Sequence, residues 1–247
     1  MIPLQALLLT FVVLFGLGTA LTLPLYHFNY QKLLHSQLFV KILFWIPIFL
    51  VFLGILYAPG GVRLGGLAAL ILLALVEYAR VIPAQKDKLL LTAYFIFFVA
   101  GLAHFGLIAQ RYPAHFIDLL ITLCFATVLS DVAAFFLGNY AGKHKLPLWL
   151  NSNKSWEGVI GQVVGGLVGV LLVRAFIVRV PTVWLFLPLG LGSAVGDLAN
   201  SFAKRRARIK DWSNAIPGHG GFIDRLSSAA GSCVAVYYFL ILSGMLR

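Results

Sequence analysis

Long apolar runs recur along the chain, and they constrain its fold more than any other feature. Eight are long enough to cross a bilayer: residues 3–25, 38–57, 63–80, 89–110, 114–138, 157–178, 181–201 and 226–245. Because backbone in lipid must satisfy its own hydrogen bonds, continuous apolar runs predict helices. A mean hydropathy of +0.95 over 247 residues is too high for a water-soluble domain of this size. The sequence therefore predicts an all-α, polytopic membrane protein with about eight transmembrane helices.

The first run and the two cysteines fit a membrane-embedded chain. The residues that begin it, MIPLQ, contain no Lys or Arg, so we expect a retained helix rather than a cleaved signal peptide. Cys124 and Cys233 both fall inside predicted helices, where we expect buried thiols rather than a disulfide.

The charges of the loops predict an orientation. Of the 19 Lys and Arg residues, 14 fall in or beside the first, third, fifth and seventh loops, and 5 fall on the opposite side. The positive-inside rule places the odd-numbered loops in the cytosol and both termini outside. We therefore expect an integral protein of the bacterial inner (cytoplasmic) membrane. Attraction to anionic lipid is a simpler reading of the basic charge in the first and third of these loops.

The chain divides into two unequal halves of one integral domain, residues 1–112 and 113–247. The first half contains two acids, Glu77 and Asp87, and no recognisable chemical motif. Glu77 precedes Arg80 by one helical turn, which predicts a surface pair. In the second half, glycines recur through the run 157–178 and predict close helix packing, which also makes a homodimer plausible. These glycines are Gly161, Gly165, Gly166 and Gly169.

Two carboxylates lie within apolar runs of the second half. Asp131 and Asp197 each fall near the end of a run that should face the cytosol. Ionisable groups inside a membrane are costly and usually face a cavity or a partner. The alternative is a carboxylate neutralised by a nearby cation for packing alone.

Helical spacing puts Asp197, Ser201, Lys204 and Arg208 on one face. A carboxylate and a hydroxyl suit a hard cation such as Mg²⁺, and the cations beyond them suit phosphate oxygens. A basic juxtamembrane helix end is the alternative, and it leaves the inward Asp197 unexplained.

A glycine-rich turn follows, Pro217-Gly218-His219-Gly220-Gly221, and then Asp224-Arg225. Glycines allow backbone amides to approach an anion, and a loop that opens a helix can present free amides to phosphate. His219 is a candidate for phosphate binding or proton transfer. Upstream, Lys154 is a candidate phosphate contact, and Trp156 fits a membrane-interface anchor. Together these residues predict a cytosolic, cation-rich, magnesium-dependent site for a phosphorylated ligand, with no nucleic-acid partner.

These segments resemble the phosphatidate cytidylyltransferase (CDP-diacylglycerol synthase) family. Its signature is close to S-x-x-K-R-x4-K-D-x-[GSA]-x2-[LIF]-P-x-H-G-G-x-x-D-R-x-D, and this chain matches it in order and spacing from Ser201 to Arg225. The upstream segments GDL, SDVAAFFLGNYAGKHKL and NSNKSWEG resemble further family segments. The likeness covers about residues 130–228.

The resemblance implies that CTP and phosphatidate react to give CDP-diacylglycerol and pyrophosphate at the membrane, for phospholipid biosynthesis. It implies Mg²⁺, alone or with a second cation, as cofactor, and it implies roles for particular residues. The catalytic residues would be Asp197, Lys204, Arg205, His219 and Asp224. The substrate-binding residues would be Lys154, Ser201, Lys210, Asp211, Gly220, Gly221 and Arg225. The metal ligands would be Asp131, Asp197 and Asp224.

The chain departs from the family pattern at a few positions. Ser227 stands where the signature ends in aspartate, Ala203 replaces a larger apolar residue, and Asn151-Ser152 replaces Ser-Pro. The serine removes a charge beside the predicted metal site. The alternatives are therefore a paralogue acting on another lipid phosphate, a CTP-dependent lipid-alcohol kinase, or an inactive or transporting family member.

Overall fold

The computed structural model describes residues 4–147, 150 and 154–245. Its main helices are α1 (Leu4–Thr22), α2 (Tyr30–Leu34), α3 (Gln37–Tyr57), α4 (Gly60–Val81), α5 (Lys88–Arg111), α6 (Phe116–Tyr140), α8 (Trp156–Phe176), α9 (Phe186–Ala207) and α10 (Phe222–Ser243). Within the described residues, eight helical segments are long and apolar enough to cross a membrane. The predicted all-α, polytopic membrane fold is therefore confirmed. The predicted motif residues 151–153 lie outside the described residues.

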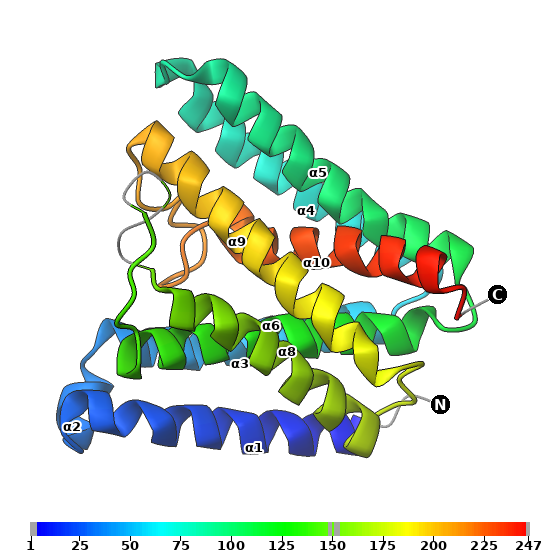
Figure 1. Cartoon of the computed structure of the whole chain (residues 1–247), viewed down its shortest axis with the longest axis horizontal. Coiled ribbons are helices and arrows are strands. Elements are labelled where there is room, and N and C mark those ends of the chain that lie inside the picture. Colours follow the sequence, from blue (N-terminus) through cyan, green and yellow to red (C-terminus); the bar gives the residue numbers. More distant parts are fainter. Residues whose placement is uncertain (1–3, 148–149, 151–153, 246–247) are drawn as a thin grey trace.

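The long helices alternate in direction, so connections collect at the two ends of the molecule (Figure 1). Helix α1 begins and α10 ends at the same end. The connections α1–α3, α4–α5, α6–α8 and α9–α10 lie at the opposite end, and these are the loops predicted to carry most of the basic charge. The topology thus gathers the segments that were predicted to form the site at one end of the molecule.

Helices α6, α8, α9 and α10 form an inner bundle, with α6 packed on α8 and α9 packed on α10. Glycine makes the first contact possible, because a Cβ at Gly165 would lie 2.2 Å from the carbonyl oxygen of Leu129. At the second contact, a Cβ at Gly196 would lie 2.0 Å from the carbonyl oxygen of Ser227. The prediction that glycines in α8 permit close helix packing is confirmed.

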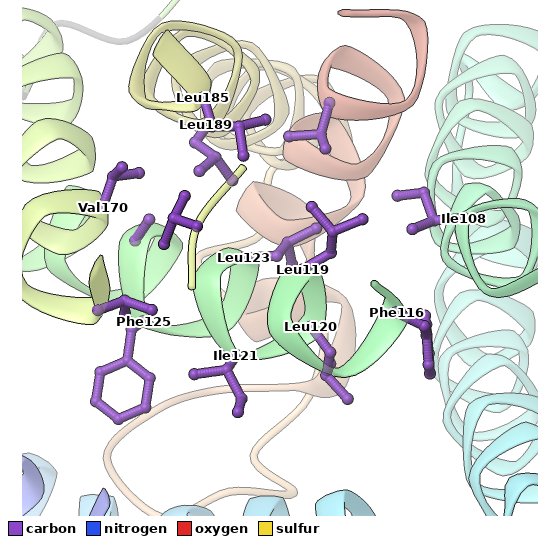
Figure 2. Close-up of a cluster of buried hydrophobic side chains, with 14 of the residues drawn as sticks. Ile108, Phe116, Leu119, Leu120, Ile121, Leu123, Phe125, Val170, Leu185 and Leu189 are labelled. Carbon is purple, nitrogen blue, oxygen red and sulfur yellow. The ribbon is translucent and has the colours of Figure 1, made fainter. Parts of the chain in front are cut away.

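Aliphatic and aromatic side chains of the inner bundle form one large buried cluster (Figure 2). Leu119 and Leu123 of α6 and Leu189 of α9 belong to this cluster, together with Val236 and Leu240 of α10. Cys233 is buried in the same cluster, Cys124 packs against it, and both cysteines are free, as predicted. This core fixes the relative positions of the helices that carry the polar site.

Two helix ends differ from the predicted runs, and both differences matter for the site. Helix α9 continues to Ala207, because basic residues in a last turn interact favourably with the helix dipole. Arg208 then adopts a left-handed conformation (φ 57°) that ends the helix, so it leaves the predicted face of Asp197. Helix α10 begins at Phe222, so Asp224 and Arg225 lie in its first turn rather than in a loop.

Candidate functional site

Asp131 on α6 is surrounded by hydroxyls from two neighbouring helices. Its Oδ1 accepts a hydrogen bond from Ser228 Oγ of α10 at 2.9 Å, and Ser193 Oγ of α9 lies 3.4 Å away. Asp197 on α9 lies within electrostatic reach of the same carboxylate. The structure therefore brings together two of the carboxylates that the sequence predicts for the site.

Asp197 is paired with Lys154, which stands just before α8. The Lys154 ammonium donates to Asp197 Oδ2, and Gln162 Nε2 of α8 lies 3.3 Å from the same oxygen. Gln162 is buried, whereas about 30% of each side chain in the ion pair remains exposed (28% for Lys154 and 31% for Asp197). Both members of the pair are thus accessible to a ligand that approaches from outside the bundle.

Asp224 lies in a closed environment. Its side chain is fully buried, with Lys204 Nζ 2.6 Å from Oδ1. Its other oxygen, Oδ2, accepts from the backbone amides of Trp212 at 2.8 Å and Gly221 at 3.0 Å. Every donor comes from the protein, so Asp224 ties the end of α9, the following loop and the start of α10 to one another.

A buried polar network supports this arrangement from α5. Asn200 Oδ1 accepts hydrogen bonds from Tyr94 Oη at 3.0 Å and Trp212 Nε1 at 2.8 Å, while Asn200 Nδ2 lies 3.5 Å from Asp224 Oδ1. The rings of Tyr94 and Trp212 are stacked. The sequence analysis did not single out Asn200. The signal available in the sequence was an amide side chain between Asp197 and Ser201, two predicted site residues of the same helix.

The glycine-rich turn closes on itself. Ile216 N donates to Gly220 O at 2.9 Å, and His219 N donates to Ile216 O at 2.8 Å. Gly218 and Gly220 have φ values of 72° and 80°, a region that other residues rarely adopt. The turn thereby presents the buried His219 ring to α3, where it meets the edge of Trp45 at 5.8 Å between centroids.

His219 is held neutral by its surroundings. Burial, followed by the positive charge of Arg225, lowers its pKa from 6.5 to about 4. A neutral imidazole has one donor and one acceptor nitrogen, and Nδ1 lies 3.4 Å from the carbonyl oxygen of Pro217. The ring is therefore neutral near pH 7, with one nitrogen able to donate and one able to accept a hydrogen bond.

The first half of the chain contributes a carboxylate that the sequence analysis assigned wrongly. Glu77 of α4 is not part of a surface pair with Arg80, because it is only 4% exposed. Its Oε1 accepts from Ser213 Oγ at 2.6 Å and Phe222 N at 2.9 Å, and its Oε2 accepts from Ile223 N at 3.0 Å. The available signal was an acid inside an apolar run, which the nearby arginine seemed to explain.

The first half also contributes a cation. Lys41 of α3 packs beside Gly218, where an added Cβ would lie 3.2 Å from Lys41 Cγ. It is within electrostatic reach of Lys210 and Arg225. A lysine at the start of an apolar run normally reads as a topology signal, so the sequence alone did not single it out.

The cations of the site fall into two groups. Lys154 and Lys204 are paired with carboxylates, and Lys204 also lies 3.9 Å from Asp211. Lys41, Lys210 and Arg225 form no ion pair with any described carboxylate. The predicted Arg205 is exposed and likewise unpaired in the described part of the chain, whereas Ser201 is buried. Cations without a carboxylate partner are available to an anionic ligand.

The fit of a hard metal ion is partial. The described residues contain no group of three or more His, Cys, Asp or Glu side chains arranged around one point. Asp131 nevertheless lies beside two serine hydroxyls and within electrostatic reach of Asp197, and carboxylate and hydroxyl oxygens are donors that suit Mg²⁺. Asp224 differs because protein donors already engage both of its oxygens. The metal-binding roles of the three stay predictions.

Ser227, which replaces the last aspartate of the signature, is buried where α10 crosses α9. Its neighbour Ser228 is the residue that bonds Asp131. Position 227 is therefore adjacent in sequence to a residue that contacts Asp131. The serine adds no negative charge there, whereas the aspartate of the signature would.

The chain is similar in sequence to one family of known proteins. The model of the cytidylyltransferase family matches residues 4–243. Phosphatidate cytidylyltransferase from Brucella suis is 37% identical over 147 residues, covering 58% of this chain and 54% of the relative. The proteins of the same name from Mycobacterium bovis and Mycobacterium leprae are 36% and 37% identical over 135 and 134 residues, covering 53% of this chain and 44% and 43% of the relatives. The matches thus span about half the length of these relatives.

Proposed function

The chain belongs to the cytidylyltransferase family, and on that premise we propose that it transfers the cytidylyl group of CTP to phosphatidate. A phosphate oxygen of the lipid forms a bond to the α-phosphorus of CTP. The bond from that phosphorus to the bridging oxygen of the β-phosphate breaks, and pyrophosphate leaves with the electron pair. The products are CDP-diacylglycerol and pyrophosphate. The observation that carries this proposal is the convergence of paired and unpaired cations beside Asp131 and Asp197 at one end of the bundle.

The reaction requires charge compensation more than it requires a base. A phosphate monoester is already anionic near neutral pH, so the attacking oxygen needs no strong proton acceptor. Two anions must approach each other, and negative charge grows on the leaving pyrophosphate. Fixed cations aimed at that charge are an effective source of catalysis, because they need no reorganisation during the reaction. Lys154 and Lys204 are held in such fixed positions by their carboxylate partners.

We assign Mg²⁺ to Asp131 and Asp197. A metal ion bound there would offset the charge of the triphosphate. The hydroxyls of Ser193 and Ser228 keep the Asp131 carboxylate oriented. Asp224 would join this set only if it released Lys204 or the loop amides, so its primary task in this arrangement is to hold Lys204.

We assign the phosphate of the lipid to the three unpaired cations Lys41, Lys210 and Arg225. Lys41 lies on α3, whose apolar residues Leu43 and Ile46 are exposed on the outside of the bundle. A lipid could keep its acyl chains against that face while its phosphate reaches the cations. We assign the triphosphate of CTP to the inner cations Lys154 and Lys204, with the exposed Arg205 at the edge of the site.

The protein is an integral membrane protein, and we propose that its site faces the cytosol of a bacterial cell. The distribution of basic residues supports this orientation, because the site lies at the end where the Lys- and Arg-rich loops collect. CTP is then supplied from the aqueous side, and the lipid is supplied from the membrane.

The deciding experiment is turnover by the purified protein with labelled CTP, phosphatidate and Mg²⁺. CDP-diacylglycerol and pyrophosphate should appear in equal amounts, and omission of phosphatidate should abolish both. Release of CDP without pyrophosphate when a lipid alcohol is supplied would identify a kinase instead. CTP binding without product would point to a different lipid phosphate. A folded protein with neither binding nor product would contradict the proposal.

A further inference from the structure

The start of α10 has the features of a phosphate-binding helix terminus, yet its amides are already bonded. The first amides of a helix have no partner within the helix and carry the positive end of its dipole. Here the amide of Gly221 donates to Asp224, and the amides of Phe222 and Ile223 donate to Glu77. Three consecutive amides are therefore engaged by carboxylates of the protein, so a substrate phosphate finds none of them free.

Burying the Glu77 carboxylate at the start of α10 costs desolvation free energy. A buried carboxylate is tolerated only when hydrogen bonds or opposite charges replace its hydration. No described Lys or Arg forms an ion pair with Glu77. Its charge is balanced instead by the two amides, the hydroxyl of Ser213 and the positive end of α10. Through these hydrogen bonds Glu77 connects α4 to the first turn of α10.

Gly221 shows how closely the carboxylate approaches. A Cβ at this position would lie 2.6 Å from both oxygens of Glu77. Glycine is therefore required here for space, whereas Gly218 and Gly220 are required for their positive φ values. The second half of the Gly-Gly pair and the acid of α4 form one structural unit, although more than 140 residues separate them in sequence.

We propose that Glu77 is a positioning residue for the transfer reaction, an inference that rests on the proposed function. Its carboxylate fixes the first turn of α10, which carries Asp224 and Arg225. Asp224 can then hold Lys204, and Arg225 can join Lys41 and Lys210 at the lipid phosphate. Glu77 does not contact a substrate. Because it occupies the backbone amides at the start of α10, the substrate phosphates bind to cationic side chains instead.

The test uses Glu77→Gln in the full-length protein, with Asp87→Asn as the matched control. The glutamine keeps the shape, but in either orientation its NH₂ group replaces an oxygen that accepts from a backbone N–H, of Phe222 or of Ile223. Asp87 is half-exposed, with only a 3.9 Å pair to Arg206, so its substitution removes a charge away from the helix start. Hydrogen exchange of the 220–224 backbone and steady-state kinetics are measured for both variants.

We expect faster exchange at 220–224 in Glu77→Gln, with exchange in α8 unchanged. We expect kcat to fall by about 100-fold, the scale of an ångström-sized misplacement of reacting groups. KM for each substrate should stay within about twofold, because the binding cations remain. Glu77→Ala with added formate provides a second measurement: formate should restore part of kcat, and chloride at equal ionic strength should not.

Wild-type exchange at 220–224 in Glu77→Gln, or a kcat equal to that of Asp87→Asn, would overturn the proposal. So would a loss of activity matched by a loss of folded protein, with normal kcat per folded molecule. Failure of the proposed function is distinguishable, because it appears as absent turnover in the wild-type protein. In that case the exchange experiment still decides whether Glu77 holds the start of α10.

Discussion

The inner bundle and the outer helices differ in how much of their surface is buried inside the protein. In α6, α8, α9 and α10, between 39% and 50% of the membrane-spanning residues are buried inside the protein, against 6% to 17% in α1, α3 and α4. The inner helices approach one another through glycines. They carry Asp131, Asp197 and Asp224, together with Lys204 and Arg225. The outer helices expose leucine, isoleucine and valine to the surroundings. The predicted site residues therefore lie mainly on the closely packed helices, while the outer layer exposes apolar side chains and contributes two long polar side chains, Lys41 and Glu77.

The inner bundle should carry the largest functional effect. Asp197→Asn removes the charge that holds Lys154 and the proposed metal ion, with little change in side-chain size. We expect turnover to fall by about 1,000-fold, as when one preorganised electrostatic contact to a transition state is lost. The measurement is kcat by product formation, together with a thermal unfolding scan.

Asp87→Asn of the outer layer is the control, and it should behave like the wild-type protein. Near-normal turnover of a folded Asp197→Asn protein would sink its assignment to the site. Equal losses in the two variants would break the distinction between inner and outer acids.

Stability should respond to the two layers in opposite ways. Gly165→Ala forces a Cβ toward the Leu129 carbonyl, so α6 and α8 must separate. We expect a loss of about 2 kcal/mol or more, the usual scale for overpacking. Gly65→Ala on α4 meets no atom within 4 Å and favours the helix, so it should be neutral or slightly stabilising. The unfolding midpoint in detergent tests both, and comparable losses would contradict the close α6–α8 contact.

The sequence predicted the spans well because the length of an apolar run is a local property. For seven of the eight predicted runs, both ends lie within four residues of the ends of the observed helix. The exception is the run that corresponds to α9. Its continuation through Lys204 to Ala207 depends on helix-dipole and tertiary contacts that hydropathy ignores. The earlier start of α10 has a similar cause, since the acid that caps it, Glu77, comes from another helix.

The site was predictable where its residues are close in sequence. Asp197, Lys204 and Asp224 could be chosen because motif spacing and buried charge point to them. Their partners could not: nothing local connects Lys154 with Asp197, or Glu77 with Ile223. The glycine turn was predicted to offer amides to phosphate, but the amides from 221 to 223 are bonded to carboxylates. Such pairings depend on how the helices pack, which a single sequence does not encode in any short window.

A substitution of Lys41 tests whether the lipid phosphate and the nucleotide are bound by different cations. Lys41→Gln removes one unpaired cation at the lipid-facing edge, while the paired inner cations remain. A lost charge-assisted hydrogen bond is worth about 1.5–3 kcal/mol. We therefore expect KM for phosphatidate to rise by about 10-fold or more, with KM for CTP unchanged. Lys32→Gln on α2 is the control, because this lysine is exposed and has no assigned role in the site. An equal rise in both KM values would contradict the assignment.

The smallest effect should come from His219, which lies where the outer helix α3 meets the glycine turn. Its pKa in the folded protein is about 4, below the ordinary 6.5, so the unfolded chain binds the extra proton first as the pH falls. Stability from this residue is therefore complete above pH 6.5 and decreases between pH 6.5 and 4. His219→Gln should flatten the dependence of the unfolding midpoint on pH in that window, whereas His35→Gln, at an exposed outer residue, should not. The same low pKa predicts no inflection near pH 6.5 from His219 in the kcat/KM profile of the wild-type protein. An inflection that disappears in His219→Gln would mean that the ring is charged in the working enzyme, and that α3 does not shield it from water.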